Sequence, residues 1–103
     1  MVKEFEDLKP ETQRILEEIK AVPYGQVSSY RDIALRAGLT NGARQVARAL
    51  HGLSESHHLP WWRIIRADGT IGMHGQGRLE QIRLLKLEGV EVTDRGKVKP
   101  KEK

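Results

Sequence analysis

The sequence predicts a mostly α-helical domain with a small β-hairpin, of the helix-turn-helix or winged-helix-like class. Three observations support this fold class: apolar residues recur at helical spacing in three successive segments, a brief turn joins the second and third, and a β-prone run with a turn signal follows. A chain of 103 residues suffices for one small core. We therefore expect a single domain over residues 1–103, with a basic, frayed tail from about residue 94.

The first two helices are predicted from their starts, stops and apolar faces. The segment "KPETQRILEEIKAV" has Pro10 in a first-turn position and brings three apolar residues to one face, Ile15, Leu16 and Ile19. In "VSSYRDIALRAGL", Ser29 and Asp32 have the spacing of a capping box, and Gly38 suits a helix stop.

The third helix, "NGARQVARALHGL", has two stripes. One is small and apolar and is expected to pack on the core: Ala43, Val46, Ala47 and Leu50. The other stripe is basic, lies next to the first and is expected to face solvent: Arg44, Arg48 and His51. These arginines have no carboxylate partners along the helix, and the chain carries a net charge of +4, so we favour contact with DNA over a merely solvated face.

The second half of the chain is predicted to contain a hairpin, a loop and a last helix. "RIIRADGTIG" is typical of a hairpin that turns at Asp68-Gly69, and the glycine-rich "GMHGQG" is expected to be an irregular loop. "RLEQIRLLKLEG" is expected to be an amphipathic helix that stops at Gly89, with its inward residues Leu79, Ile82 and Leu85.

Composition excludes several classes of function. The chain has no cysteine, which excludes disulfides, thiolate metal sites and a cysteine nucleophile, and its four histidines lack the spacing of zinc ligands. We expect no metal and no cofactor. The N-terminal "MVKEFEDLK" has no apolar stretch typical of a secretion signal, and no run of residues is apolar enough to span a membrane. We expect a cytoplasmic protein, associated with the nucleoid if the source is bacterial.

Five motifs occur in an order and spacing that resemble a known family. They are "VPYGQVSSYRDIA", "ARQVARAL", "PWWRI", "DGTIG" and "RLEQIRLLKLEGV", and they extend from about Leu16 to Val92. Together they are similar to the DNA-binding domain of the O6-alkylguanine-DNA alkyltransferases. In the active enzymes the central motif is Pro-Cys-His-Arg, whose cysteine takes the alkyl group from damaged guanine. Here Trp61 stands in the place of the cysteine and Trp62 in that of the histidine.

The resemblance implies an alkyltransferase-like protein that is not an enzyme. Those proteins carry tryptophan for the cysteine, although their commonest motif is Pro-Trp-His-Arg, from which Trp62 departs. The chemistry agrees, because alkyl transfer needs a thiolate or a comparable nucleophile with a neighbouring base, and a neutral indole is neither.

The resemblance also implies which residues contact DNA. In the family a tyrosine crowds the phosphate of the target nucleotide, and an arginine fills the hole that the flipped base leaves in the duplex. The residues expected to bind DNA here are Tyr30, Arg44, Gln45 and Arg48. Many active enzymes have glycine at the position of Arg48, which we expect to point to a phosphate.

A pocket for the alkylated base is implied as well, lined by Tyr30, Trp61, Ile64, Met73, His74 and Gly75. For His74 two interpretations stay open, a lid over the pocket or an exposed loop histidine. Three further residues are expected to be structural and near the site: Trp62, Arg63 and Glu88. For Trp62, packing under the hairpin is preferred to a place in the pocket.

The predicted function is therefore a DNA damage sensor that flips O6-alkylguanine out of duplex DNA. The resemblance implies a monomer that binds such DNA through the minor groove and passes the lesion to nucleotide excision repair proteins. One alternative is a winged-helix transcription regulator that reads a specific sequence, but it leaves Tyr30 and "LPWWRII" without a role. Another is an enzyme with an unanticipated nucleophile.

Overall fold

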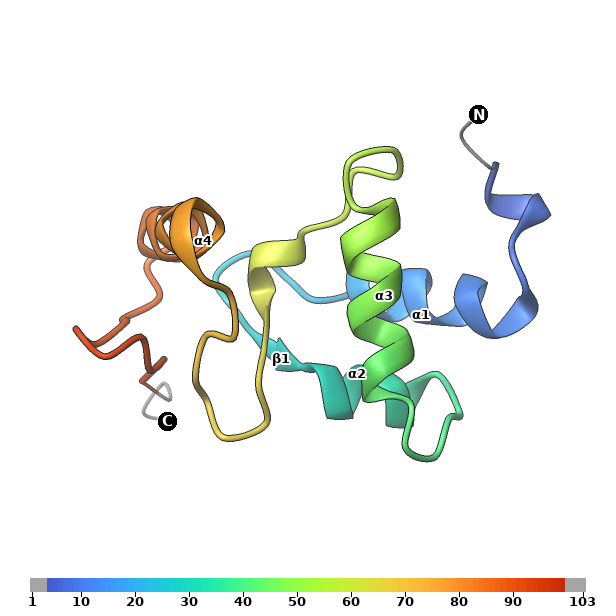
Figure 1. Cartoon of the computed structure of the whole chain (residues 1–103), viewed down its shortest axis with the longest axis horizontal. Helices are drawn as coiled ribbons and strands as arrows, with labels where there is room; N and C mark the ends of the chain where they lie inside the picture. Colours follow the sequence, from blue (N-terminus) through green and yellow to red (C-terminus); the bar gives the residue numbers. More distant parts are fainter. Residues whose placement is uncertain (1–3, 100–103) are drawn as a thin grey trace.

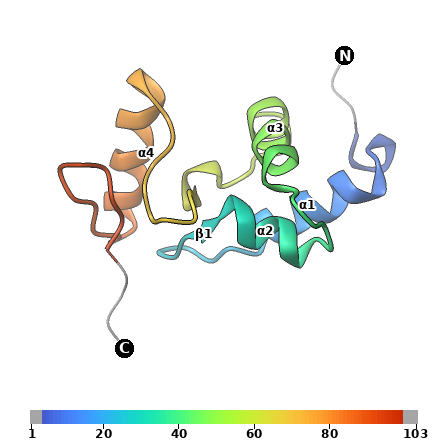
Figure 2. The ribbon, with the colours of Figure 1, turned by 60° about the horizontal axis from the view of Figure 1, so that its bottom comes forward.

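The structure, a computed structural model, describes residues 4–99 as a helical assembly with one very short sheet. Its helices are α1 (Pro10–Lys20), α2 (Tyr30–Arg36), α3 (Ala43–Leu53) and α4 (Gly75–Leu87), with 3₁₀ turns η1 (Phe5–Asp7) and η2 (Trp61–Arg63) and strands β1 (Ser28–Ser29) and β2 (Ile64–Ile65). Figure 1 shows α1, α2 and α3 grouped together, with α4 and the C-terminal segment on the other side of the strands. Figure 2 shows the same division after rotation. Within residues 4–99 no helix is long and apolar enough to cross a membrane.

The first two helices begin where the sequence predicts, and α1 ends at Lys20, two residues before the end of the predicted segment. Pro10 starts α1, and the Oγ atom of Ser29 accepts a hydrogen bond of 3.0 Å from the backbone N–H of Asp32 at the start of α2. Past the end of α2, Gly38 has a φ of +82°, a left-handed conformation that glycine adopts without strain. The turn to α3 closes the helix-turn-helix.

Adjacent serines provide a matched test of this cap. Ser28 and Ser29 are equally buried, at 8% exposed, but the Oγ atom of Ser28 has no hydrogen-bond partner within the described residues. We expect Ser29→Ala to lower the free energy of unfolding by about 1 kcal/mol, because a helix cap is lost. Ser28→Ala is expected to change it little or raise it. Urea titration of both variants checks this, and equal losses would contradict the capping role.

The buried face of α3 differs from the predicted one at Ala47 and Ala49. Ala47 is exposed, whereas Ala49 is 7% exposed and packs in the core with Val46 and Leu50. Ala47 and Ala49 lie on two different faces of α3, so the apolar periodicity could not decide which of them is buried. The packing of α1 and α2 on Val46 and Ala49 decides the orientation.

The sheet pairs segments that are far apart in the chain. The Asp68-Gly69 turn is present as predicted, with Gly69 at φ +88° and a 2.9 Å hydrogen bond from the Arg66 N–H to the Thr70 carbonyl. The strand before the turn, however, pairs in parallel with β1, since Ser28 lies opposite Ile64 and Ser29 opposite Ile65. The segment after the turn bridges Lys97 instead. Local turn signals do not specify such long-range partners.

Residues 94–99, the described part of the predicted tail, contact the rest of the chain. Val98 is 7% exposed and donates its N–H to the Gly69 carbonyl, and Lys99 donates its own to that of Glu91, both at 2.9 Å. Val98 packs in a cluster with Ile71 and Val90, a contact that the lysine-rich composition of the segment does not predict. Residues 100–103 of the predicted tail lie outside the described residues.

The last helix begins earlier and faces differently than predicted. It starts at Gly75, inside the expected glycine-rich loop, and Leu79 is 63% exposed rather than inward. Leu85 is fully buried, as expected, and Gln81 is buried beside it. The Nε2 atom of Gln81 donates to the carbonyls of Trp62 and Ile64, both at 3.1 Å. A polar residue thus takes an inward position because the η2 turn and β2 offer it backbone acceptors.

Two separate clusters of buried side chains result. The helical core gathers side chains of α1, α2 and α3 together with Leu59 and Ile64, and Trp61 packs against it. The C-terminal core consists of Ile65, Ile71, Leu85, Val90 and Val98, and Trp62 packs against it. Neighbouring residues of "WWRII" therefore belong to different cores.

Candidate functional site

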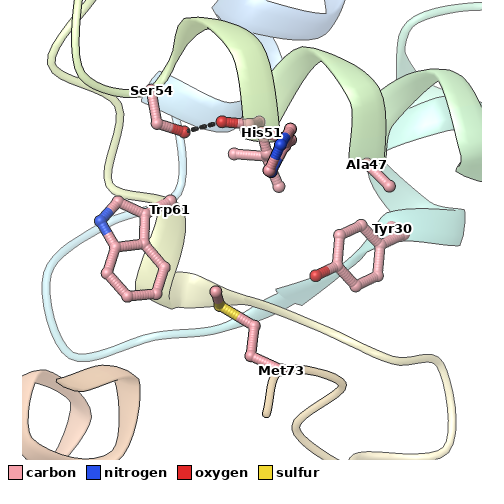
Figure 3. Close-up of a pocket in the computed structure, with 7 residues that line it drawn as sticks. Tyr30, Ala47, His51, Ser54, Trp61 and Met73 are labelled. Carbon is pink, nitrogen blue, oxygen red and sulfur yellow. Dashed lines mark hydrogen bonds between the residues drawn. The ribbon is translucent and has the colours of Figure 1, made fainter. Parts of the chain in front are cut away.

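A cavity of about 420 Å³ opens between α3, the start of α2, the η2 turn and the loop before α4. Figure 3 shows the Trp61 ring and the Tyr30 ring at opposite sides, His51 above and Met73 below. The full lining consists of Tyr30, Ala47, Leu50, His51, Ser54, Trp61 and Met73. Most of these atoms are apolar, and the cavity has the size typical of a small-molecule or base pocket.

Local structure places each wall. Tyr30 is the first residue of α2, directly after the capping Ser29, and it is half-buried. Burial raises the pKa of the Tyr30 hydroxyl, an effect that the positive charge of Arg66 partly offsets. A neutral Tyr30 can donate a hydrogen bond to a ligand in the cavity. Trp61 starts the η2 turn after Pro60.

The structure brings only some of the predicted pocket residues together. Tyr30, Trp61 and Met73 line the cavity. Ile64 is fully buried in the helical core and is not among the lining residues. His74 and Gly75 form the start of α4, are exposed, and are not among them either.

The sequence did not predict that residues of α3 line the pocket. Ala47, Leu50, His51 and Ser54 follow one another at i, i+3, i+4 and i+7, so they share one helix face. That spacing was visible in the sequence, but Ala47 and Leu50 were assigned to the core and His51 to the basic stripe. The missing information was that the η2 turn stands opposite this face.

The predicted DNA-binding residues of α3 are all exposed: Arg44, Gln45 and Arg48. They do not line the cavity. Gln45 and Arg48 border a different hollow, formed with residues 7–15. The arginines are therefore available to a large partner that covers α3, beside the cavity rather than inside it.

Outside the cavity lining, Glu88 at the end of α4 connects to the loop at Gly25 and to the η2 turn. Its carboxylate accepts hydrogen bonds from the Gly25 N–H at 2.9 Å, from the Trp62 Nε1–H at 2.8 Å and from Arg63, whose Nη2 lies 2.8 Å away. Arg63 also donates to the Val22 carbonyl at 3.0 Å. The two charged side chains are 14% and 6% exposed, so this is a nearly buried ion pair. The structural roles expected for Arg63 and Glu88 agree with these contacts.

Two opposing effects act on the pKa of Glu88. Desolvation by burial raises it, but the hydrogen bonds from Arg63, Gly25 and Trp62 together outweigh that effect. The pKa is lowered from an ordinary 4.5 to about 2, so Glu88 is ionised at neutral pH.

Trp62 is part of this network and does not line the cavity. Its ring stands edge-on to that of Trp61, with centroids 6.0 Å apart and planes at 88°. The Arg63 guanidinium lies 5.4 Å from the Trp62 ring centroid and 5.7 Å from that of Tyr24. Of the two interpretations of Trp62, inward packing is the one that this geometry supports.

The arrangement is suited to binding a flat guest. The sequence contains no cysteine, and the residue that faces the cavity from the η2 turn is a neutral indole. Within residues 4–99 no group of three His, Cys, Asp or Glu side chains is placed to hold a metal ion. Flat apolar walls suit a planar aromatic guest.

Comparison with known proteins decides the family. The sequence model described as "6-O-methylguanine DNA methyltransferase, DNA binding domain" matches residues 10–90. The chain belongs to this family. The match covers all four helices and the two strands, and the resemblance expected from the five motifs is confirmed.

Within the methyltransferase DNA-binding family, similar curated proteins carry names that refer to base flipping or to alkyltransferase likeness. A "DNA base-flipping protein" of Vibrio parahaemolyticus is 41% identical over 80 residues, which is 78% of this chain and 80% of that protein. "Alkyltransferase-like protein 1" of Schizosaccharomyces pombe is 37% identical over 81 residues, covering 77% and 75% of the two chains.

A solved structure of the family confirms the fold. The S. pombe Atl1 protein, crystallised "in complex with damaged DNA containing O6-carboxymethylguanine", aligns with a TM-score of 0.75 at 34% sequence identity. The alignment covers 89% of each chain. The helical DNA-binding fold with its small β element is therefore shown for this member of the family.

Proposed function

We propose that this protein is a non-enzymatic sensor of O6-alkylguanine in duplex DNA. It binds as a monomer, takes the damaged base out of the stack into the cavity of Tyr30 and Trp61, transfers no alkyl group and leaves the lesion to nucleotide excision repair. The observation that carries the proposal is the cavity itself, with a tryptophan at the position where the motif of active enzymes has cysteine. The names of its relatives and the damaged DNA in the Atl1 crystal support it.

Binding begins with α3 in the minor groove. Exposed Ala47 allows close approach, and Arg44 at the start of the helix reaches the duplex next to the cavity. Its planar guanidinium can stack and hydrogen-bond in the space that the flipped base leaves. Extrusion of a base costs a few kcal/mol, and the cost is smaller for a base that pairs poorly, as O6-alkylguanine does.

Inside the cavity the apolar walls recognise the adduct. Trp61, Met73 and Leu50 offer aromatic, thioether and aliphatic surface. Each CH₂ group removed from water contributes about 0.8 kcal/mol, so larger alkyl groups are expected to bind progressively better until the cavity is full.

The test is a comparison of two duplexes of one sequence, with and without a single O6-methylguanine. The proposal requires clearly tighter binding of the modified duplex, measured by fluorescence anisotropy. Equal binding of both would contradict it. Strong dependence on the flanking sequence without any response to the adduct would favour a winged-helix regulator, a function in which the cavity has no role.

Arg44→Ala is expected to weaken binding of the alkylated duplex by about 1–3 kcal/mol, the usual effect of losing one specific DNA contact. The loss should be smaller on single-stranded DNA, where no stack needs filling. Arg83→Ala is the charge-matched control, because Arg83 is an exposed arginine of α4 whose ion-pair partner is Glu80. If both variants lose the same affinity, Arg44 contributes only net charge.

Trp61→Cys alone is expected not to create an alkyltransferase. A thiol needs a neighbouring base to become a thiolate, and the neighbouring Trp62 has no basic nitrogen and donates its N–H to Glu88. Mass spectrometry after incubation with alkylated DNA should show no mass gain. The double variant with Trp62→His restores an imidazole beside Glu88 and is the informative comparison. A mass gain in the single variant would refute this account.

A further inference from the structure

The cavity contains one polar side chain that the proposed function does not use. Three of its lining residues are polar: Tyr30, His51 and Ser54. The Ser54 hydroxyl donates its hydrogen to the Leu50 carbonyl of its own helix. His51 makes no hydrogen bond or ion pair anywhere in the part of the chain that the structure describes, and its side chain is exposed to the cavity. Figure 3 shows the imidazole between Trp61 and Tyr30.

An imidazole in this position changes what the cavity can recognise. Histidine carries at least one N–H donor in either protonation state, so it can bind an acceptor atom whether or not it is charged. Trp61, Met73, Leu50 and Ala47 contact alkyl groups through apolar surface, and the Tyr30 hydroxyl is a second possible donor on the opposite side of the cavity from Trp61. His51 therefore offers a directional contact to a substituent that ends in oxygen.

The charges around His51 also favour an anionic guest. No carboxylate lines the cavity. Arg48 lies three residues earlier on α3, at a spacing that puts it on a neighbouring part of the helix surface. Glu55, four residues later, is exposed beyond the end of α3 and is not among the lining residues. A carboxylate on the adduct would thus meet a donor and a positive surface without a facing negative group.

We propose that His51 is a specificity-determining residue that selects O6 substituents ending in a hydrogen-bond acceptor, with a carboxylate preferred most strongly. This inference rests on the proposed function, because it assumes that the flipped base occupies the cavity. It deepens that function by naming the class of adduct: an O6-carboxymethyl group is bound more tightly than a purely alkyl group of similar shape.

The test uses three duplexes that differ in one base: guanine, O6-isobutylguanine and O6-carboxymethylguanine. The two substituents have a similar branched shape, but only carboxymethyl has oxygen acceptors. His51→Phe keeps a flat ring without the N–H and is expected to lose about tenfold in affinity for the carboxymethyl duplex, as expected for a hydrogen bond to a charged group. Its affinity for the isobutyl duplex should be unchanged.

Two further variants make the result specific. His51→Gln retains an N–H donor and is expected to recover part of the carboxymethyl affinity. His74→Phe changes a histidine that is near Met73 in sequence but outside the cavity lining, and it should behave like the wild type. His51 is exposed, so its replacement is expected to leave the melting temperature unchanged, which verifies that each variant is folded.

The outcomes separate this inference from the function on which it rests. Equal losses of affinity for all three duplexes would show that His51 contacts the DNA backbone, and would overturn the inference. A wild type that prefers both adducts to guanine, with a ratio between them that His51→Phe leaves unchanged, would overturn the inference and leave the proposed function standing. If the wild type prefers neither adduct to guanine, the proposed function itself fails.

Discussion

Glu88→Gln is expected to lower the free energy of unfolding by about 3–5 kcal/mol, the effect of removing one partner of a buried ion pair. Arg63 would keep its charge at 14% exposure without an anionic partner. The amide that replaces the carboxylate offers a single acceptor oxygen, whereas the carboxylate accepts from Gly25, Trp62 and Arg63. The contact between the C-terminal end of α4, the η2 turn and the loop at Gly25 would be weakened.

Glu91→Gln is the matched control, because it removes a carboxylate three residues away. Glu91 pairs with Lys99 at 3.6 Å, and both side chains are mostly exposed. Exposed ion pairs contribute little to stability, so only a slight change is expected. Chemical denaturation of the three proteins measures the difference. Similar losses in both variants would mean that the burial of the Glu88 pair has no energetic consequence.

The same residue gives stability a defined dependence on pH. The folded-state pKa of Glu88, about 2, lies below its ordinary value of 4.5. The stabilisation is therefore fully present above about pH 5 and is lost as the pH falls from the ordinary value through about 2. Wild type should lose melting temperature over this window, and Glu88→Gln should show a flatter profile there.

The two tryptophans are expected to respond to alanine in different ways. Trp62→Ala removes a ring that packs on the C-terminal core and a hydrogen bond to Glu88, and should cost roughly 3–5 kcal/mol of stability, as large-to-small changes in packed sites do. Trp61→Ala should cost less stability because one face of its ring borders an open cavity. It should instead erode the preference for alkylated over normal guanine.

Thermal melting and the paired-duplex assay, applied to both variants, check this contrast. Binding of undamaged DNA by Trp61→Ala should change little, since phosphate contacts determine that affinity. A Trp61→Ala protein that is strongly destabilised yet still discriminates between the two duplexes would show that Trp61 is a core residue and would refute the pocket.

The parts of the fold that the sequence predicted depend on local chemistry. The cap at Ser29, the proline at the start of α1 and the turn at Asp68-Gly69 are all specified within a few residues. Errors arose where the partner is distant in the chain. The strand at Ile64 pairs with Ser28, thirty-six positions earlier, and Val98 packs on the C-terminal core although its neighbours are lysines.

Only those residues of the candidate site that belong to a family motif could be predicted from the sequence. Tyr30, Trp61 and Met73 were expected from the resemblance, and they line one cavity. His51 and Ser54 were not expected there, because an amphipathic pattern shows which residues share a helix face but not what stands opposite that face. His74 was expected in the pocket because it follows Met73 in the sequence. It is the N-cap residue of α4 and is not among the lining residues.

The division of "WWRII" between two cores has a consequence for how this chain tolerates insertions and deletions. Trp61 and Ile64 are directed to the helical core, Trp62 and Ile65 to the C-terminal core. Removal of a single residue between Pro60 and Ile64 would reverse this alternation, so that side chains that pack in one core would point toward the other. In this segment the residue at the cavity wall can therefore be replaced, while the number of residues from Pro60 to Ile65 is fixed by the two cores.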